Sequence, residues 1–154
     1  ASGRMGALKV LYGLWPSVDG EGAIPVSHME NNREFFELKY TAARVRAARR
    51  IEEVALGQVV GVNGYTTVVQ AQRLCEHLDL EAGATLLDVG AGRGWPGSYI
   101  AETTGCRLVS ADVPWEALLA AKLRRETGVV KACGESLPFR GDSFDAIVHT
   151  DVFC

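Results

Sequence analysis

The sequence predicts an α/β fold: a doubly wound, mostly parallel sheet preceded by N-terminal helices. From residue 81 onward, short apolar runs alternate with helical segments across short connections. This alternation is typical of a parallel sheet with right-handed crossovers. The first apolar run leads directly into a cluster of glycines, as a buried parallel strand does. These two observations predict the fold class.

Composition and charge narrow the class of protein. The 154 residues are 47% hydrophobic and 23% charged, and their formal net charge is −3. These values suit one globular domain and provide no global field that would attract nucleic acid or an anionic membrane. No apolar run is long enough to span a bilayer, and the 4 cysteines show neither metal-ligand spacing nor a nearby histidine cluster. We expect a cytoplasmic protein with no metal site, no nucleic-acid partner and no membrane contact.

The chain divides into three segments. Residues 1–28 are rich in glycine and show no sustained periodicity, which predicts an irregular or disordered leader. Met29 begins a stretch that looks like the start of a domain, so residues 29–80 are expected to form an N-terminal helical segment. Residues 81–154 then hold the alternating strands and helices.

Two helices are predicted within residues 29–80. Apolar residues recur at near-helical spacing over residues 30–56, where arginines and glutamates are interleaved as on a solvated face. Glycines then break the pattern. The second helix is predicted to run from about Thr67 to Leu78, with Thr66 or Thr67 as its N-cap.

Beyond residue 80 the pattern predicts four strands. They cover residues 85–89, 107–111, 129–132 and 144–149. Pro96 suits the first turn of the helix after the first strand, and Gly105 suits its C-terminal cap. Pro114 opens a second helix over residues 115–127, which Gly128 is expected to close.

The glycine-rich segment at residues 88–94, Asp-Val-Gly-Ala-Gly-Arg-Gly, indicates a ligand site. Glycine allows unusual dihedral angles and lets a ligand approach the backbone closely. Open parallel sheets bind ligands beyond the carboxyl ends of their strands. The segment therefore predicts a nucleotide-like cofactor without deciding which one.

A dinucleotide site is the main alternative. Residues 92–97 satisfy G-x-G-x-x-G, and Asp112 follows at about the expected separation. However, Gly90 holds the strand end, and counted from Gly90 the third glycine is replaced by Trp95. Asp88 would also repel a pyrophosphate, whereas it suits a cofactor that carries an ammonium group.

The residues from about 65 to 153 resemble the class I, Rossmann-like methyltransferases that use S-adenosylmethionine, in particular the small-molecule type. Three motifs carry the resemblance in order. They are Leu-Leu-Asp-Val-Gly-Ala-Gly-Arg-Gly at 86–94, Asp112 at the end of the second strand, and Gly-Glu-Ser-Leu-Pro-Phe at 134–139 followed by Asp-Ser-Phe-Asp at 142–145.

The resemblance implies a set of cofactor-binding residues. The glycine segment would contact the methionine portion, Asp112 the ribose hydroxyls, Glu135 the adenine amino group and Ser136 the ring edge. The helical segment 29–80 would cap this cofactor site. The full set that the resemblance implies is Tyr65, Asp88, Gly90, Ala91, Gly92, Gly94, Asp112, Val113, Glu135, Ser136 and Thr150.

The resemblance also implies methyl transfer from S-adenosylmethionine to a small-molecule acceptor, with S-adenosylhomocysteine as product. A general base is needed only if the acceptor must lose a proton. The candidates are His149 and Asp151, which lie at the carboxyl end of the fourth strand where the methyl group should be. His149 is also suited to inward-facing packing.

The pattern stops before the sheet of this family is complete. Residues 81–154 correspond to the N-terminal half of the domain, so the apolar edge of the fourth strand is expected to be exposed. We expect little activity unless a complementing chain or a homodimer covers that edge. A nicotinamide-dependent oxidoreductase and a non-catalytic interaction module remain the alternatives.

Overall fold

A computed structural model describes residues 9–12, 46–56, 59, 65–125, 127–150 and 152. The helices and strands among them are β1 (Lys9–Tyr12), α2 (Arg46–Leu56), α3 (Val68–Leu78), β2 (Thr85–Val89), α4 (Gly97–Thr104), β3 (Arg107–Asp112), α5 (Trp115–Arg124), β4 (Gly128–Lys131) and β5 (Ala146–His149). None of these described helices has the length and apolar character needed to cross a bilayer.

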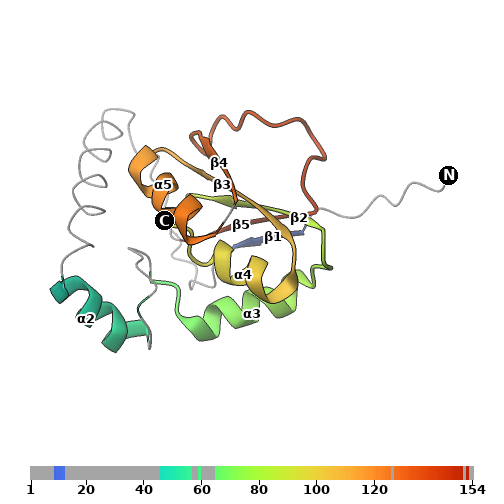
Figure 1. Cartoon of the computed structure of the whole chain (residues 1–154). Coiled ribbons are helices and arrows are strands. Elements are labelled where there is room, and N and C mark those ends of the chain that lie inside the picture. Colours follow the sequence, from blue (N-terminus) through green and yellow to red (C-terminus); the bar gives the residue numbers. More distant parts are fainter. Residues whose placement is uncertain are drawn as a thin grey trace, which may run out of the picture.

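The strands form one five-stranded sheet in the order β1-β5-β2-β3-β4. Every described pair of neighbours is parallel. The chain passes from β2 outward through β3 to β4 and then returns to the other side of β2 as β5 (Figure 1). The α/β fold with a doubly wound parallel sheet is therefore confirmed.

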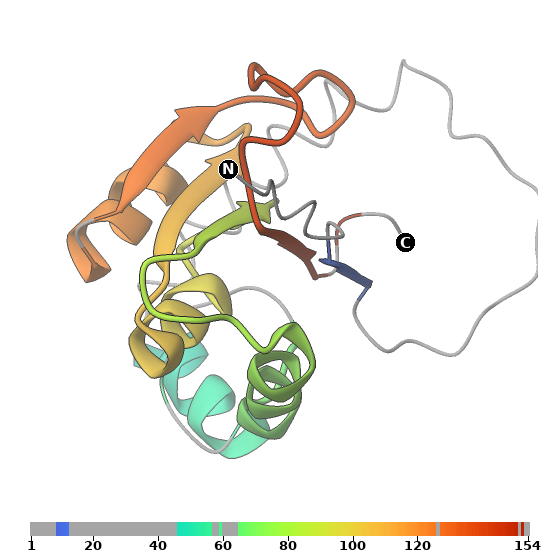
Figure 2. The ribbon, with the colours of Figure 1, turned by 90° about the vertical axis from the view of Figure 1, so that its right-hand side faces the viewer.

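Each face of the sheet carries its own apolar cluster, because successive side chains of a strand point to opposite faces. On one face, α3 and α4 pack against the strands, and Figure 2 shows these two helices together on that side. This cluster, the helix-side core, consists of Leu74, Leu78, Leu86, Ile100, Ala101, Cys106, Leu108, Ala146 and Val148. On the other face, Leu137, Phe139 and Phe144 pack against Leu87 and Val89.

The predicted start of α3 is confirmed. Thr67 is the N-cap, and its hydroxyl accepts a hydrogen bond from the Gln70 N–H. The Gln70 side-chain oxygen accepts in turn from the Thr67 N–H at 2.7 Å. This reciprocal pair satisfies two backbone donors at the helix end, and it fixes the direction in which the chain enters α3.

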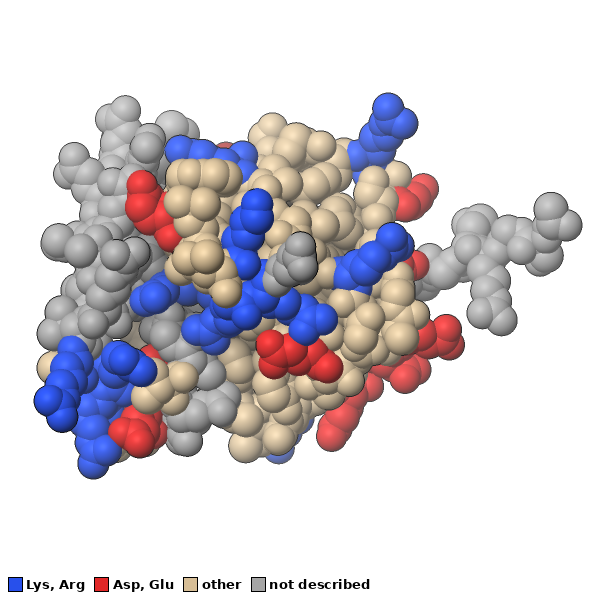
Figure 3. Space-filling model, viewed as in Figure 1, with Lys and Arg blue, Asp and Glu red and all other residues tan. Residues whose placement is uncertain are grey.

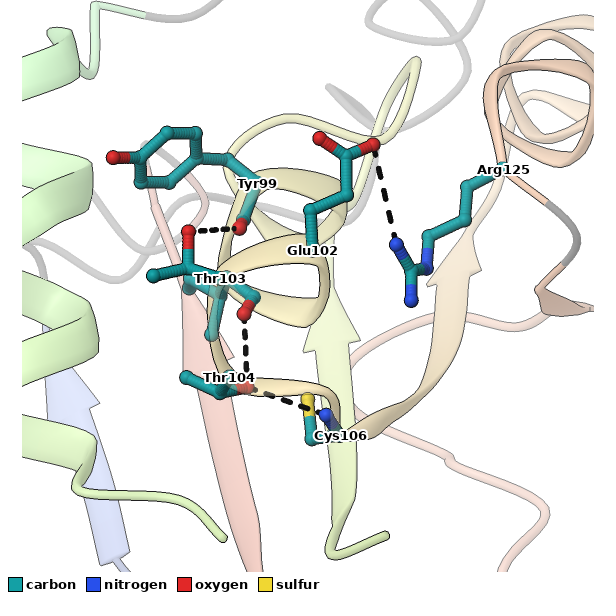
Figure 4. Close-up of polar contacts among 7 residues, drawn as sticks. Tyr99, Glu102, Thr103, Thr104, Cys106 and Arg125 are labelled. Carbon is teal, nitrogen blue, oxygen red and sulfur yellow. Dashed lines mark hydrogen bonds and ion pairs between the residues drawn. The ribbon is translucent and has the colours of Figure 1, made fainter. Parts of the chain in front are cut away.

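The end of α4 is held by local hydrogen bonds, which Figure 4 shows. The hydroxyls of Thr103 and Thr104 donate to carbonyls four residues earlier, both at 2.9 Å. Gly105 has φ 75° and caps the helix, as expected. Glu102 lies 4.0 Å from the Arg125 guanidinium and links α4 to the end of α5.

Several predicted boundaries differ from those of the structure. The helix expected over residues 115–127 ends at Arg124, and Gly128 begins β4 instead of closing the helix. The Thr127 hydroxyl donates to the Leu108 carbonyl at 2.6 Å, so contacts with β3 draw the chain into the sheet early. β5 begins at residue 146 rather than 144, because the Asp145 carboxylate binds the Thr85 N–H and hydroxyl instead of continuing the strand.

The leader was expected to be irregular, but Lys9–Tyr12 forms β1. It runs parallel to β5, with Lys9 opposite Ala146 and Tyr12 opposite His149. The expectation of an exposed edge on β5 is corrected by the same strand. An unpaired strand edge presents backbone N–H and C=O groups that need partners, and this short segment supplies them. The rest of the leader and residues 29–45 lie outside the described residues.

The surface of α2 is partly as predicted. Arg50 and Glu53 form an exposed ion pair at 2.7 Å, and basic and acidic side chains lie together where α2 reaches the surface in Figure 3. The solvated face is thus confirmed for the described part of this helix. Ile51 and Val54, two of the apolar residues that recur at near-helical spacing, are exposed.

Candidate functional site

The glycine-rich loop leaves β2 at the carboxyl edge of the sheet. The N–H groups of Gly90 and Ala91 both donate to the Ala111 carbonyl, at 2.8 and 3.2 Å, so the loop bends over the end of β3. Gly90 has φ 70°, and a Cβ there would collide with the Val152 side chain. Gly92 and Gly94 also have positive φ, and a Cβ at Gly94 would lie 3.1 Å from that of Ala121 in α5. The loop therefore requires glycine both for its dihedral angles and for its close neighbours.

Asp112, at the end of β3, is tied to this loop. One carboxylate oxygen accepts from the Gly92 N–H at 2.6 Å, and the other accepts from the Val113 N–H at 2.7 Å. Burial raises the pKa of Asp112, and these two N–H groups oppose the rise. Each oxygen retains a further lone pair. Asp112 can thus bind a diol while it holds the loop.

Asp88 lies beneath the loop, not in front of it. Its exposure is 1%, and its carboxylate reaches the first residue of α4, where a Cβ on Gly97 would collide with Oδ2. Burial raises the pKa of Asp88 well above its usual range, the negative charge of Asp112 adds to this, and the Gly97 backbone opposes it. Among the described residues, Oδ2 of Asp88 and Oγ of the neighbouring Ser110 have no hydrogen-bond partner. Asp88 is therefore a buried carboxyl group packed between the end of β2 and the start of α4.

The residues of the third motif lie in the segment after β4. The Ala132 N–H donates to the Asp112 carbonyl at 3.0 Å, which brings this segment to the end of β3. A tight turn follows, in which the Ser136 N–H donates to the Cys133 carbonyl at 3.0 Å. The side chains of Glu135 and Ser136 are exposed at this turn. They share the carboxyl edge with Asp112 but do not contact it through any hydrogen bond of the described residues.

The end of β5 lies directly beside the glycine loop. His149 pairs in register with Val89, and burial lowers its pKa, so the imidazole is neutral at physiological pH. Thr150 follows and is half-buried. Val152 then packs against Gly90. Asp151, the second candidate base, lies outside the described residues.

Trp95, at the end of the glycine loop, contacts the segment that follows Tyr65. Tyr65 precedes α3, and its side chain is exposed. The Trp95 indole N–H, at the end of the glycine loop, donates to the Thr66 carbonyl at 2.8 Å. Sequence reasoning treated Trp95 only as a departure from a glycine motif and missed this contact. Its bulk at a position where glycine was expected was the available signal.

Part of the chain is similar to proteins of known family. Residues 87–154 match the family described as "Methyltransferase domain". Over this stretch the chain is similar to methyltransferase domains. The methyltransferase GfsG of Streptomyces halstedii is 37% identical over 83 residues, which cover 49% of this chain and 30% of that protein. An uncharacterized methyltransferase of Mycolicibacterium vanbaalenii is 33% identical over 116 residues, which cover 72% of this chain and 45% of that protein. The chain thus spans less than half the length of both relatives.

Solved structures support the Rossmann-like methyltransferase fold. The phosphoethanolamine N-methyltransferase 2 of Haemonchus contortus, in complex with phosphomonomethylethanolamine and S-adenosylhomocysteine, superposes with a TM-score of 0.59 at 17% identity. The match covers 76% of this chain and 28% of that one. The complex of the Haloferax volcanii Trm112 methyltransferase activator with a methyltransferase gives a TM-score of 0.53 at 20% identity, covering 72% and 46%. The sheet and its helices therefore share the fold of these solved structures.

Proposed function

We propose that this chain binds S-adenosylmethionine and takes part in methyl transfer to a small-molecule acceptor. The observation that carries the proposal is the position of Asp112, which joins the glycine loop to the end of β3 with both carboxylate oxygens. It lies within the residues that match the methyltransferase family. A carboxylate at this point is suited to the two hydroxyls of a ribose.

The beginning of α4 favours a cofactor without phosphate. In a dinucleotide site the pyrophosphate lies at the N-terminus of the helix after the first strand. Here the Asp88 carboxyl group occupies that end of α4, against Gly97. A phosphate at this place would meet a buried carboxyl group instead of free N–H donors. The residues present thus fit S-adenosylmethionine better than a nicotinamide dinucleotide.

Each candidate residue then has a role in binding. Asp112 holds the ribose, and the backbone of the glycine loop lies along the methionine portion. Glu135 and Ser136 contact the adenine, with Val113 as part of the pocket wall. Tyr65, Ala91 and Thr150 border the methionine end, and Asp88 supports the loop from below. The helical segment before β2 caps this site.

When bound, the cofactor supplies an electrophilic methyl group on a sulfonium with a good leaving group. The chain's own residues therefore have to align the acceptor and exclude water. Of the two candidate bases, His149 lies among the described residues. A neutral imidazole can take up the proton that the methyl acceptor loses. Asp151 is the second candidate. A small-molecule acceptor is supported by the Haemonchus contortus neighbour, which is named for such a substrate.

A partner would bind at the edge of β5 that faces away from β2, where β1 pairs in this chain. Among the described residues, β1 pairs with that edge over residues 9–12. A complementing chain or a second copy could replace this short strand, and one structural neighbour was solved with a partner protein. We propose that the chain alone has little activity and that such a partner increases it. A cytoplasmic location remains a prediction.

A thermal-shift experiment separates the two cofactor classes. S-adenosylhomocysteine at about 100 times its Kd should stabilise the chain by about 2.7 kcal/mol, whereas NADH at the same concentration should leave the melting temperature unchanged. Stabilisation by NADH but not by S-adenosylhomocysteine would support the oxidoreductase instead. No shift with either ligand, from a cooperatively melting chain, would support a non-catalytic module.

A further inference from the structure

We infer that Trp95 is a positioning residue that holds Tyr65 over the methionine end of the cofactor. The inference rests on the proposed function and assigns a role to a residue that is not among the cofactor-binding residues implied by the resemblance. It starts from the hydrogen bond between the Trp95 indole and the Thr66 carbonyl.

This hydrogen bond is buried at both ends. Trp95 and Thr66 are each 7% exposed, and the N···O distance is 2.8 Å. The indole N–H can only donate, so its partner carbonyl fixes the orientation of the ring. Conversely, the carbonyl of Thr66 is held at a set place relative to the glycine loop. Loss of this contact would leave a buried polar group unsatisfied.

The ring of Trp95 is itself held by packing. It forms a small cluster with the buried Ala71 of α3, together with Val68 and Tyr99, and this cluster is separate from the helix-side core. The rings of Trp95 and Tyr99 lie 5.5 Å apart at 57°. The indole therefore fills the space between α3 and α4 while its N–H reaches the segment before α3.

Thr66 is held from its other side as well. The next residue, Thr67, is locked into the first turn of α3 by its reciprocal bonds with Gln70. Two independent contacts thus fix the backbone immediately after Tyr65, one to the glycine loop and one to α3. The Tyr65 side chain is 72% exposed. The Tyr65 side chain therefore leaves a backbone that is fixed relative to the glycine loop, and it is open to solvent, where a ligand can reach it.

A purely structural role for Trp95 is the competing explanation. In that case the indole only attaches α3 to the sheet, and its loss lowers stability without any link to Tyr65. A positioning role predicts instead that the effects of Trp95 and Tyr65 on ligand affinity are coupled. A double-mutant cycle measures this coupling directly.

The experiment is a calorimetric titration of the full chain with S-adenosylhomocysteine. Trp95→Phe keeps an aromatic ring but removes the N–H donor, and Tyr65→Ala removes the contact that it positions. We expect each substitution to weaken affinity by about threefold to tenfold, and the double variant to bind no more weakly than Tyr65→Ala. Trp115→Phe, on the surface of α5, is the matched control and should bind like the wild type.

The result that overturns the inference is an equal loss from Trp95→Phe in the presence and absence of Tyr65, or no loss at all. Failure of the proposed function gives a different pattern, in which the wild type does not bind or Asp112→Ala binds equally well.

Nuclear magnetic resonance of the wild-type chain provides a measurement without substitution. S-adenosylhomocysteine should slow hydrogen exchange of the Trp95 indole N–H together with the Tyr65 and Thr66 amides. Unchanged exchange at these groups in the saturated chain would also overturn the inference.

Discussion

The helix-side core and the carboxyl edge of the sheet are built from opposite kinds of contact. In the core, Leu86, Ile100 and Val148 are fully buried among aliphatic neighbours. At the edge, Asp88 of β2 is buried and Asp112 of β3 is half-buried, and burial raises the pKa of both carboxyl groups. Burial without full compensation costs stability. The edge is therefore arranged for something other than stability, and ligand binding is the function that its geometry supports.

The strongest test of the core side is Leu86→Ala. Removing this fully buried side chain should lower the free energy of unfolding by about 2–5 kcal/mol, because it leaves a cavity between the sheet and the helices. Urea denaturation measures the loss, and Leu123→Ala on the exposed face of α5 is the control. The folded fraction should bind S-adenosylhomocysteine as the wild type does. A selective loss of affinity would show that core and edge are not separable.

Gly90→Ala tests the edge side. The new methyl group would collide with the Val152 side chain, and the backbone at residue 90 has φ 70°. Gly83 supplies a matched control, since it has φ 87° but nothing within 4 Å of an added Cβ. Gly83→Ala should lower the free energy of unfolding by about 1–2 kcal/mol, because alanine is strained in this left-handed backbone conformation. Gly90→Ala should lower the free energy of unfolding by more than Gly83→Ala does, and it should also weaken ligand binding. Adding Val152→Ala to the Gly90→Ala chain should recover part of the lost stability. Equal costs for the two glycines would contradict the close approach of Val152.

The pH dependence of stability in Asp88→Asn tests the edge side of the comparison between core and edge. The folded state holds the Asp88 proton more tightly than the unfolded state, so its contribution to stability decreases as pH rises from the usual carboxyl pKa toward the raised value. The amide that replaces the carboxyl group cannot ionise, so the variant should gain melting temperature over the wild type near neutral pH and lose that gain in acid. A stability difference between the two chains that is the same at every pH would show that Asp88 is not destabilised by burial.

Asp145 provides the opposite case among the described carboxylates. Hydrogen bonds from the Thr85 N–H, and then from its hydroxyl, lower the pKa of Asp145. Its contribution to stability is present above the usual carboxyl pKa and is lost as pH falls through the lowered value. Asp145→Asn should therefore lower the melting temperature near neutral pH, with the difference shrinking in acid. The same pH series as for Asp88→Asn measures it, and a gain in stability would contradict the contacts with Thr85.

The smallest expected effect is that of Thr67→Ala. Loss of the N-cap should cost about 1 kcal/mol of stability. Thr103→Ala, which removes a hydroxyl bonded to a carbonyl within α4, is the matched control and should change stability less. Thermal unfolding of the three chains measures both. An unchanged melting temperature for Thr67→Ala would indicate that the capping box does not hold the start of α3.

What the sequence could predict depends on how local each contact is. Thr67 and Gly105 act on backbone groups within a few residues, and both ends of helices were predicted correctly. The end of α5 was not, because the bond from Thr127 to Leu108 crosses between strands. β1 was missed for the same reason, since its described partner strand, β5, lies at the far end of the chain.

The candidate site shows the same division. Its residues could be placed along the carboxyl edge from strand order alone. The position of Asp88 beneath the loop could not be predicted in this way. It depends on the register that pairs Asp88 with Ser110 of β3 and on the face of β2 toward which the Asp88 side chain points. The bond from Trp95 to Thr66 joins segments 29 residues apart, and no spacing rule indicates it.

The most direct test of the central claim is a calorimetric titration of wild type, Asp112→Ala and Glu76→Ala with S-adenosylhomocysteine. Glu76, exposed on α3, is the matched acidic control. Loss of bonds to a charged group should weaken Asp112→Ala by about tenfold to a hundredfold, while Glu76→Ala binds as the wild type does. Equal affinity in all three chains, or no binding by a folded wild type, would contradict the assignment of this edge as a site for S-adenosylmethionine.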